Sequence, residues 1–212
     1  SNAMTTHQVK KSEAKRQHIL DSGFHLVLRK GFVGVGLQEI LKTSGVPKGS
    51  FYHYFESKEA FGCELLKHYI SDYQIRLNQL WTTETSARDK LMNYLQCWVK
   101  DPATEQSWAE SCLIVKMAAE VADLSEDMRL IMNDGVKRLI ARMADLIRIG
   151  QQEGSIQTSV VPDVLAQVIY QMYLGAALLS KLYKHKAPLF QALESTKMML
   201  DGCNHVQQDK NQ

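Results

Sequence analysis

The sequence predicts an all-α protein of about nine helices. Only four of its 212 residues are proline, and the strict alternation of apolar and polar residues that marks a half-buried strand is nearly absent. Apolar residues instead recur three and four positions apart, which places them on one face of a helix. With 45% hydrophobic and 23% charged residues, the chain has ordinary soluble-protein composition and the length for one large or two small domains.

Four helices are expected in the N-terminal part of the chain. Gly31 ends the first helix and Gly45 ends the second, because glycine accepts the backbone conformation of a helix C-cap. Pro47 stands at the start of the third helix, and Ser57 supplies a cap for a long fourth helix. On these signals the helices cover residues 12–30, 37–44, 48–55 and 58–81.

Five more helices are expected after a polar threonine- and serine-rich break. Pro102 stops the fifth helix, Ser125 caps the seventh with acidic residues in its first turn, and Gly154 ends it. Pro162 and Pro188 open the last two. These helices cover residues 87–100, 111–124, 126–153, 162–184 and 188–200.

The cysteines and the missing motifs exclude several classes of protein. The four cysteines are widely separated, which argues against a zinc finger, a dithiol redox site and a secreted disulfide framework. No P-loop, glycine-rich dinucleotide motif or G-x-S-x-G element is present, and Glu64 with His68 lacks the second such pair that a helical metal site needs. We therefore expect no enzyme activity, no metal and no cofactor. Without an apolar run of about 18 residues or a signal segment, the expected location is cytoplasmic.

Charge is distributed unevenly along the chain. Residues 1–60 hold nine lysines and arginines against five acidic residues, a net charge of +4, whereas residues 61–212 hold 16 against 18, a net charge of −2. A basic segment joined to a mildly acidic one indicates a polyanion as the partner of the N-terminal part.

The segment from Gly31 to Phe61 has the pattern of a helix-turn-helix, in which the second short helix lies in the DNA major groove. That helix carries amine, hydroxyl and imidazole groups, a glycine that allows close approach, and a lysine just beyond it. The candidate DNA contacts are Lys48, Gly49, Ser50, Tyr52, His53, Tyr54 and Lys58. The alternative is that this aromatic-rich helix is simply part of the core.

The run GVPKGSFYHYFESKEAF resembles the signature of TetR/AcrR-family transcriptional repressors, and Ile40 stands where that family has its helix-packing isoleucine. The resemblance implies a homodimer on a palindromic operator, with the same residues contacting DNA and the last two helices forming the dimer interface. Val35 and Gly36 stand where the family often has a phosphate-binding threonine or serine. Gln38 or a backbone N–H is then the expected replacement.

On this resemblance the chain divides into an N-terminal three-helix DNA reader and a C-terminal ligand-sensing and dimerisation bundle. The fourth helix joins the two and is expected to carry a shift between them. The expected parts are a tag remnant with a disordered N-terminus over residues 1–9, a DNA-binding domain over 10–56, a regulatory domain over 57–201 and a flexible tail over 202–212.

Cys112 is the candidate sensor residue. It lies in the first turn of the helix expected over 111–124, where the dipole stabilises a thiolate, although Glu110 opposes this effect. The segment resembles an electrophile-sensing subgroup of the same family, in which a cysteine at this position reacts with electrophiles, reactive aldehydes or chlorine oxidants. Lys181 matches a lysine associated with that cysteine. The alternatives are a buried apolar cysteine and an ordinary solvated lysine.

Two other kinds of protein stay open at this stage. A repressor of the same type released by a reversible apolar ligand would use a pocket lined by residues such as Met92, Met117, Met143, Met172 and Trp98, although such residues are more often core. A dimeric adaptor without DNA binding would leave the basic aromatic helix at residues 48–55 unexplained.

Overall fold

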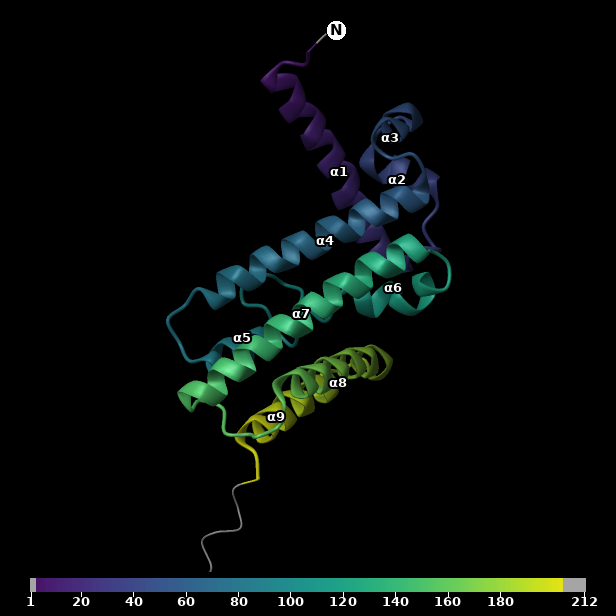
Figure 1. The fold of residues 1–212 in the computed structure, drawn as a ribbon. Helices are drawn as coiled ribbons and strands as arrows, with labels where there is room; N and C mark the ends of the chain where they lie inside the picture. The colour runs from purple at the N-terminus through teal and green to yellow at the C-terminus, as the bar shows by residue number, and fades with distance from the viewer. Residues whose placement is uncertain (1–2, 204–212) are drawn as a thin grey trace, which may run out of the picture. The chain divides into compact units, whose positions relative to one another are not determined.

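The computed structural model describes residues 3–203 (Figure 1). Those residues form nine α-helices and no strand, which confirms the all-α prediction. The helices are α1 (Thr6–Lys30), α2 (Leu37–Ser44), α3 (Lys48–Tyr54), α4 (Lys58–Trp81), α5 (Ala87–Cys97), α6 (Leu113–Ala122), α7 (Glu126–Glu153), α8 (Pro162–Tyr183) and α9 (Ala187–Asp201). Within this part of the chain, no helix has both the length and the apolar character that a membrane span requires.

The first helix begins earlier than expected. The Thr5 side chain accepts a hydrogen bond from the backbone N–H of Gln8 at 3.2 Å, and the Gln8 side chain accepts one from the N–H of Thr5 at 2.9 Å. This reciprocal capping box starts α1 at Thr6 instead of residue 12. Residues 6–9, expected in a disordered N-terminus, are therefore helical. Of the tail expected over 202–212, residues 204–212 lie outside the described residues.

Two helix ends in the middle of the chain also differ from expectation. The expected fifth helix runs to residue 100, but α5 ends at Cys97, whose carbonyl accepts the N–H of Trp108 at 2.9 Å. In a continued helix the Cys97 carbonyl would instead accept the backbone N–H of the residue four positions later. The next helix was expected from residue 111 but begins at Leu113, because hydrogen-bonded turns occupy residues 107–112.

The chain divides into two compact units. The first unit contains the chain up to Asp72 together with Lys116–Asn133, and the second contains Tyr73–Val115 together with the chain from Asp134 onward. Helices α4, α6 and α7 therefore each contribute residues to both units. The sequence-based division at residue 56 stays a prediction, since these units are defined by contacts and not by function.

Three phenylalanine rings hold the first unit together. Phe51 of α3, Phe55 at its end and Phe61 of α4 are buried, with ring centroids 5.2–5.6 Å apart. Gly23 of α1 lies against the same cluster, and a Cβ atom there would stand 2.2 Å from the ring of Phe61. Close packing of α1 on this cluster fixes the orientation of α3, so that the opposite side of α3 is left exposed.

The second unit has an aromatic core and a helical hairpin. Trp98, the residue that follows α5, packs edge-on against Tyr173 of α8, with 5.8 Å between ring centroids. The Tyr173 hydroxyl shares a hydrogen bond of 2.9 Å with Thr196 of α9, and burial raises the pKa of Tyr173 to about 12. A three-residue link joins α8 to α9, and the two helices lie side by side (Figure 1).

Candidate nucleic-acid interface and reactive cysteine

Helices α2 and α3 form the two-helix element that the sequence predicts. Gly45 closes α2 with a left-handed backbone at φ 69°, and Pro47 precedes α3. Burial of Phe51 turns the polar side of α3 outward. Of the candidate contacts, Gln38, Lys48, Gly49, Tyr52 and His53 are exposed, whereas Ser50, Tyr54 and Lys58 are half-buried.

Several candidate side chains are held in place by their neighbours. The Tyr54 hydroxyl shares a hydrogen bond of 3.1 Å with Ser12 of α1. The Lys48 ammonium lies 5.9 Å from the centre of the Tyr52 ring. At Gly49, an added Cβ would meet no atom of the described chain within 4 Å, so this part of α3 is open to an approaching molecule.

Lys58 is less free than the sequence suggests. Its ammonium lies 4.6 Å from the centre of the Phe32 ring, and burial lowers its pKa while the nearby Glu120 carboxylate opposes that shift. Glu120, on α6, also accepts the backbone N–H of Val33 at 2.5 Å. A carboxylate on α6 therefore contacts the loop before α2 and faces a candidate phosphate-binding lysine.

Sequence reasoning missed two groups of residues in this unit. The early start of α1 places Lys10 and Lys11 on an exposed helical turn ahead of Ser12, and the Thr5–Gln8 capping box was the signal that would have found it. Lys116 and Glu120 of α6 contact the end of α1 and the following loop from 87 residues away. No local pattern predicts such a contact.

Cys112 stands immediately before α6 and not inside its first turn. Its sulfur accepts the backbone N–H of Val115 at 3.5 Å, the bond that an N-cap side chain makes to the third residue of a helix. The side chain is buried, with 4% of the residue exposed. From this position before α6, the sulfur still faces the positive end of the helix dipole. The dipole therefore still favours a thiolate.

The other cysteines have less favourable surroundings. Burial raises the pKa of Cys97 to about 11, and the carboxylate of Asp101 adds to the shift. Burial also raises the pKa of Cys63, and the nearby carboxylates of Asp127 and Glu59 raise it further. Cys203 is exposed, just beyond α9. Cys97 and the half-buried Cys63 thus both lie where a thiolate is disfavoured.

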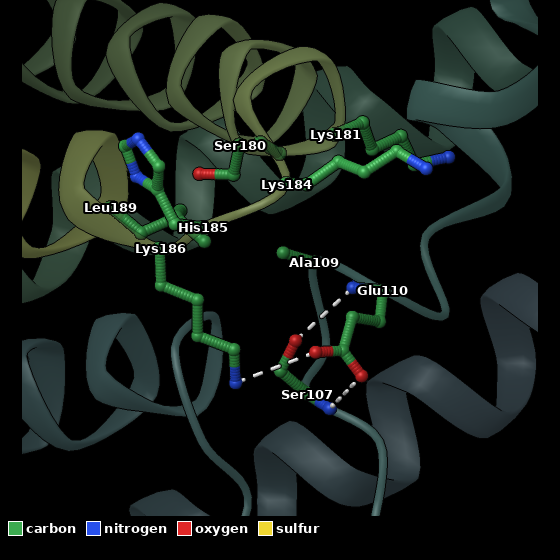
Figure 2. Close-up of a pocket in the computed structure, with 10 residues that line it drawn as sticks. Ser107, Ala109, Glu110, Ser180, Lys181, Lys184, His185, Lys186 and Leu189 are labelled. Atoms are coloured by element: carbon green, nitrogen blue, oxygen red, sulfur yellow. Dashed lines mark hydrogen bonds and ion pairs between the residues drawn. The ribbon is translucent and has the colours of Figure 1, made fainter.

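Lys181 lies on α8 and is exposed, whereas the Cys112 thiol is enclosed. Lys181 lines a cavity of about 220 Å³ together with Ala109 and Glu110 from the segment before Cys112 (Figure 2). Cys112 itself is not part of the cavity wall. Burial raises the pKa of Tyr170, and the charge of a Cys112 thiolate adds to that shift.

Two family descriptions match the chain. Residues 19–61 match "Bacterial regulatory proteins, tetR family", and residues 87–196 match "Tetracyclin repressor-like, C-terminal domain". The second match alone covers half of the chain. The protein belongs to the TetR family.

Relatives of known name agree with this assignment. The chain is 40% identical to the HTH-type transcriptional repressor NemR of Escherichia coli K12, covering 87% of this chain and 93% of NemR. It is 32% identical to the repressor DhaR of a Mycobacterium species, covering 84% and 88% of the two chains. These TetR-family proteins are transcriptional regulators and not enzymes.

Solved structures share both fold and sequence with the chain. The crystal structure of reduced E. coli NemR superposes with a TM-score of 0.80 at 42% identity, over 87% of this chain and 95% of that one. A crystal structure of a TetR/AcrR family member has a TM-score of 0.82 at 95% identity, over 89% and 100%. The protein is therefore a TetR-type transcriptional repressor, similar to NemR, from a family whose members bind DNA as dimers.

Proposed function

We propose that this repressor binds a palindromic operator as a homodimer and leaves it when Cys112 reacts with an electrophile, a reactive aldehyde or a chlorine oxidant. The observation that carries the proposal is the position of the Cys112 sulfur, which accepts the Val115 N–H at the start of α6. Because its target is chromosomal DNA, the location that we propose for the repressor is the cytoplasm.

The exposed side of α3 supports the DNA-reading part of the proposal. Lys48, Tyr52 and His53 are exposed there, on a helix that the buried Phe51 holds in one orientation. In a dimer, two copies of α3 read half-sites about one helical turn apart, roughly 34–36 Å. Neutralisation of phosphates by lysine makes the affinity fall steeply with salt concentration.

The chemistry at Cys112 follows from its capping bond. A thiolate is the nucleophilic form of cysteine, and a backbone N–H at a helix N-terminus stabilises it relative to the thiol. Addition of an electrophile replaces that acceptor with a bulkier thioether, which loses the negative charge that the N–H groups favour. Because the residue is buried, the added group does not fit without movement of the start of α6.

Helix α6 offers a route from the thiol to the DNA reader. From Lys116 onward α6 belongs to the first compact unit, where the Lys116 ammonium donates to the carbonyl of Arg29 at 3.0 Å. One turn later, Glu120 accepts the N–H of Val33. A shift of α6 therefore acts on the segment that leads into α2, in addition to the shift expected of α4.

The test compares Cys112→Ser with Cys97→Ser in a fluorescence anisotropy titration of operator DNA. The DNA is the region upstream of the protein's own gene, and N-ethylmaleimide serves as the electrophile. Both variants should bind DNA like the wild type, and only Cys112→Ser should stay bound after treatment. Undiminished release of Cys112→Ser by N-ethylmaleimide would place the sensor elsewhere.

The methionines that suggested release by a reversible apolar ligand give that alternative no support. Met117 and Met143 are fully buried in the core. None of the methionines that suggested such a pocket lines the cavity of Figure 2.

A further inference from the structure

Helix α1 reaches beyond the helices on which it packs in the first unit. The Ser12 hydroxyl shares a hydrogen bond of 3.1 Å with Tyr54, the last residue of α3. Further along α1, the His18 ring donates to the carbonyl of Ser44, the last residue of α2, at 2.8 Å. Every residue from 3 to 11 is exposed, so the first turns of α1 project past both contacts (Figure 1).

Two lysines lie on the side of α1 that is turned toward α2 and α3. Lys15 comes three residues after Ser12 and three residues before His18. At 3.6 residues per turn, this spacing places Lys15 between the directions of those two side chains. Lys11 lies one turn before Lys15 on the same side, and both lysines are exposed. The two lysines are separated by about 6 Å along the helix axis, so each can bind a phosphate of its own.

The positive charge on this side of α1 is not neutralised within the protein. Lys11 and Lys15 form no ion pair with any residue from 3 to 203. The sequence has three acidic residues up to position 55. Two of them, Asp21 and Glu39, each accept a hydrogen bond from another side chain. The third, Glu13, is two positions from each lysine and therefore lies on the opposite side of α1.

The basic side of α1 belongs to a fixed helix. The Arg16 guanidinium donates to the Glu64 carboxylate of α4 at 2.8 Å and lies 5.4 Å from the centre of the Phe55 ring. The capping box at Thr5 keeps the projecting turns helical. Because the helix is already ordered, binding to a partner costs little additional backbone entropy.

The contact between α1 and α3 places this basic side next to the DNA reader. When α3 lies in the major groove, the phosphates of the two strands border it on both sides, across a width of about 12 Å. Side chains of α1 touch α3 only at its last residue, Tyr54, so α1 stands beside the groove and not within it. Phosphates are therefore the part of the duplex that Lys11 and Lys15 can reach.

We propose that Lys11 and Lys15 bind the phosphate backbone beside the half-site that α3 reads. These lysines add two phosphate contacts per chain, and such contacts position a protein on DNA without reading its bases. The proposal rests on the DNA-reading part of the proposed function and is independent of Cys112.

The test measures how the DNA affinity of the full chain depends on salt, by fluorescence anisotropy with the same upstream DNA. The variant replaces both lysines, Lys11→Gln and Lys15→Gln, and should bind at least tenfold more weakly at physiological salt. A dimer that loses four phosphate contacts should have a slope of log affinity against log salt that is about 3 to 4 units less steep. Arginine at both positions keeps the charge and should retain the wild-type slope.

The matched control carries Lys10→Gln and Lys137→Gln, which lower the net charge by the same amount. Lys10 is exposed next to Lys11 but points more than a quarter turn away from it, and Lys137 is exposed on α7. This control should keep the wild-type slope. An equal loss in the control would show that only net charge matters, and an unchanged slope in the Lys11 and Lys15 variant would show that these lysines do not contact DNA; either result overturns the proposal.

A second measurement locates the contacts on the DNA. Ethylation of individual phosphates should interfere with wild-type binding at positions beside each half-site, and the Lys11 and Lys15 variant should lose that interference while keeping it within the half-site. The same set of interfering phosphates for both proteins would exclude direct contact and overturn the proposal. A wild type that binds no duplex would instead overturn the DNA-reading proposal itself, so the two failures are distinguishable. Glutamine is nearly as good a helix former as lysine, so an unchanged melting temperature is expected throughout.

Discussion

The two buried cysteines, Cys112 and Cys97, differ in the polar group nearest to the sulfur. At Cys112 the enclosed sulfur keeps a backbone N–H as its partner, which compensates a thiolate for part of its lost hydration. At Cys97 burial comes with the neighbouring carboxylate of Asp101, and both raise the pKa of the thiol. We therefore expect the selectivity of reagents among these thiols to depend on the nearest polar group as well as on exposure.

Cys97 provides a pH-dependent test of this argument. Its pKa of about 11 in the folded protein lies above the ordinary thiol value of 9.0. Alkylation of Cys97 by iodoacetamide should be very slow at pH 8 and rise about tenfold per pH unit up to about pH 11, because only the thiolate reacts. Peptide mass spectrometry measures the rate, with the exposed Cys203 as the control.

The same shift has a consequence for stability. Below pH 9 the thiol is protonated in both the folded and unfolded states and has no effect on the free energy of unfolding. Between pH 9 and pH 11 the unfolded state loses the proton first, so the contribution of Cys97 to stability falls as pH rises. Labelling of native Cys97 at the rate of Cys203 at pH 8 would contradict its burial and its raised pKa.

Helix α6 is capped by Cys112 at its start, and its Glu120 side chain contacts the loop between α1 and α2. Gly31 allows this close contact. Its φ of 79° suits glycine, and an added Cβ would stand 2.7 Å from the Glu120 carboxylate. Glu120 then bonds Val33 and faces Lys58. One short helix thus joins the turn that ends at Cys112 to the loop that precedes α2.

Glu120→Ala should separate modification from release. N-ethylmaleimide should still alkylate Cys112 at the wild-type rate, because the substitution lies two turns away, but DNA release should become incomplete since α6 no longer holds Val33. Mass spectrometry and anisotropy measure the two effects on one sample. Glu126→Ala is the control, because the Glu126 carboxylate accepts a hydrogen bond from Arg129 within α7 and does not bond the loop before α2. Full release by alkylated Glu120→Ala would remove α6 from the route.

At the same scale, local signals predicted much of the fold. Gly45, Ser57 and Ser125 act as caps where the sequence places them: Gly45 closes α2, and the serine hydroxyls accept N–H groups of Ala60 and Met128. The end of α2 and the starts of α4 and α7 follow from these interactions. Each involves residues within four positions of one another, which is the range over which sequence patterns carry information.

Contacts between distant residues explain what was missed. The end of α5 depends on a bond from Trp108 to Cys97, across a turn that no periodicity marks. Glu120 and Val33 are 87 residues apart, so their pairing exists only in the folded unit. The candidate residues of α3 could be predicted because they share one helix, whereas the cavity of Figure 2 is lined by two segments far apart in the sequence and could not.

For the whole molecule, an exposed apolar surface on α8 and α9 indicates how two copies associate. Val164, Val168 and Leu178 share one side of α8 at spacings near multiples of a helical turn, and Phe190 and Met198 lie on α9. These five side chains are 42% to 68% exposed in the single chain. Adjacent helices that expose this much apolar surface form an association site.

Leu178→Glu should convert the dimer to a monomer without unfolding it, because a charge on this surface costs nothing in the isolated chain but is desolvated in the interface. Light scattering after gel filtration measures the mass. Ile75→Glu, on α4 and 53% exposed, is the matched control and should stay dimeric. A dimeric Leu178→Glu would place the interface on another surface.

The Leu178→Glu monomer also tests how the affinity for DNA depends on phosphate contacts. Each Leu178→Glu chain keeps its α3 and so still binds phosphates, but it occupies one half-site instead of two. The slope of log affinity against log salt should therefore fall to about half that of the wild type, since the slope scales with the phosphates neutralised. An unchanged slope would mean that one chain makes all the phosphate contacts, and the palindromic operator would then have no physical basis.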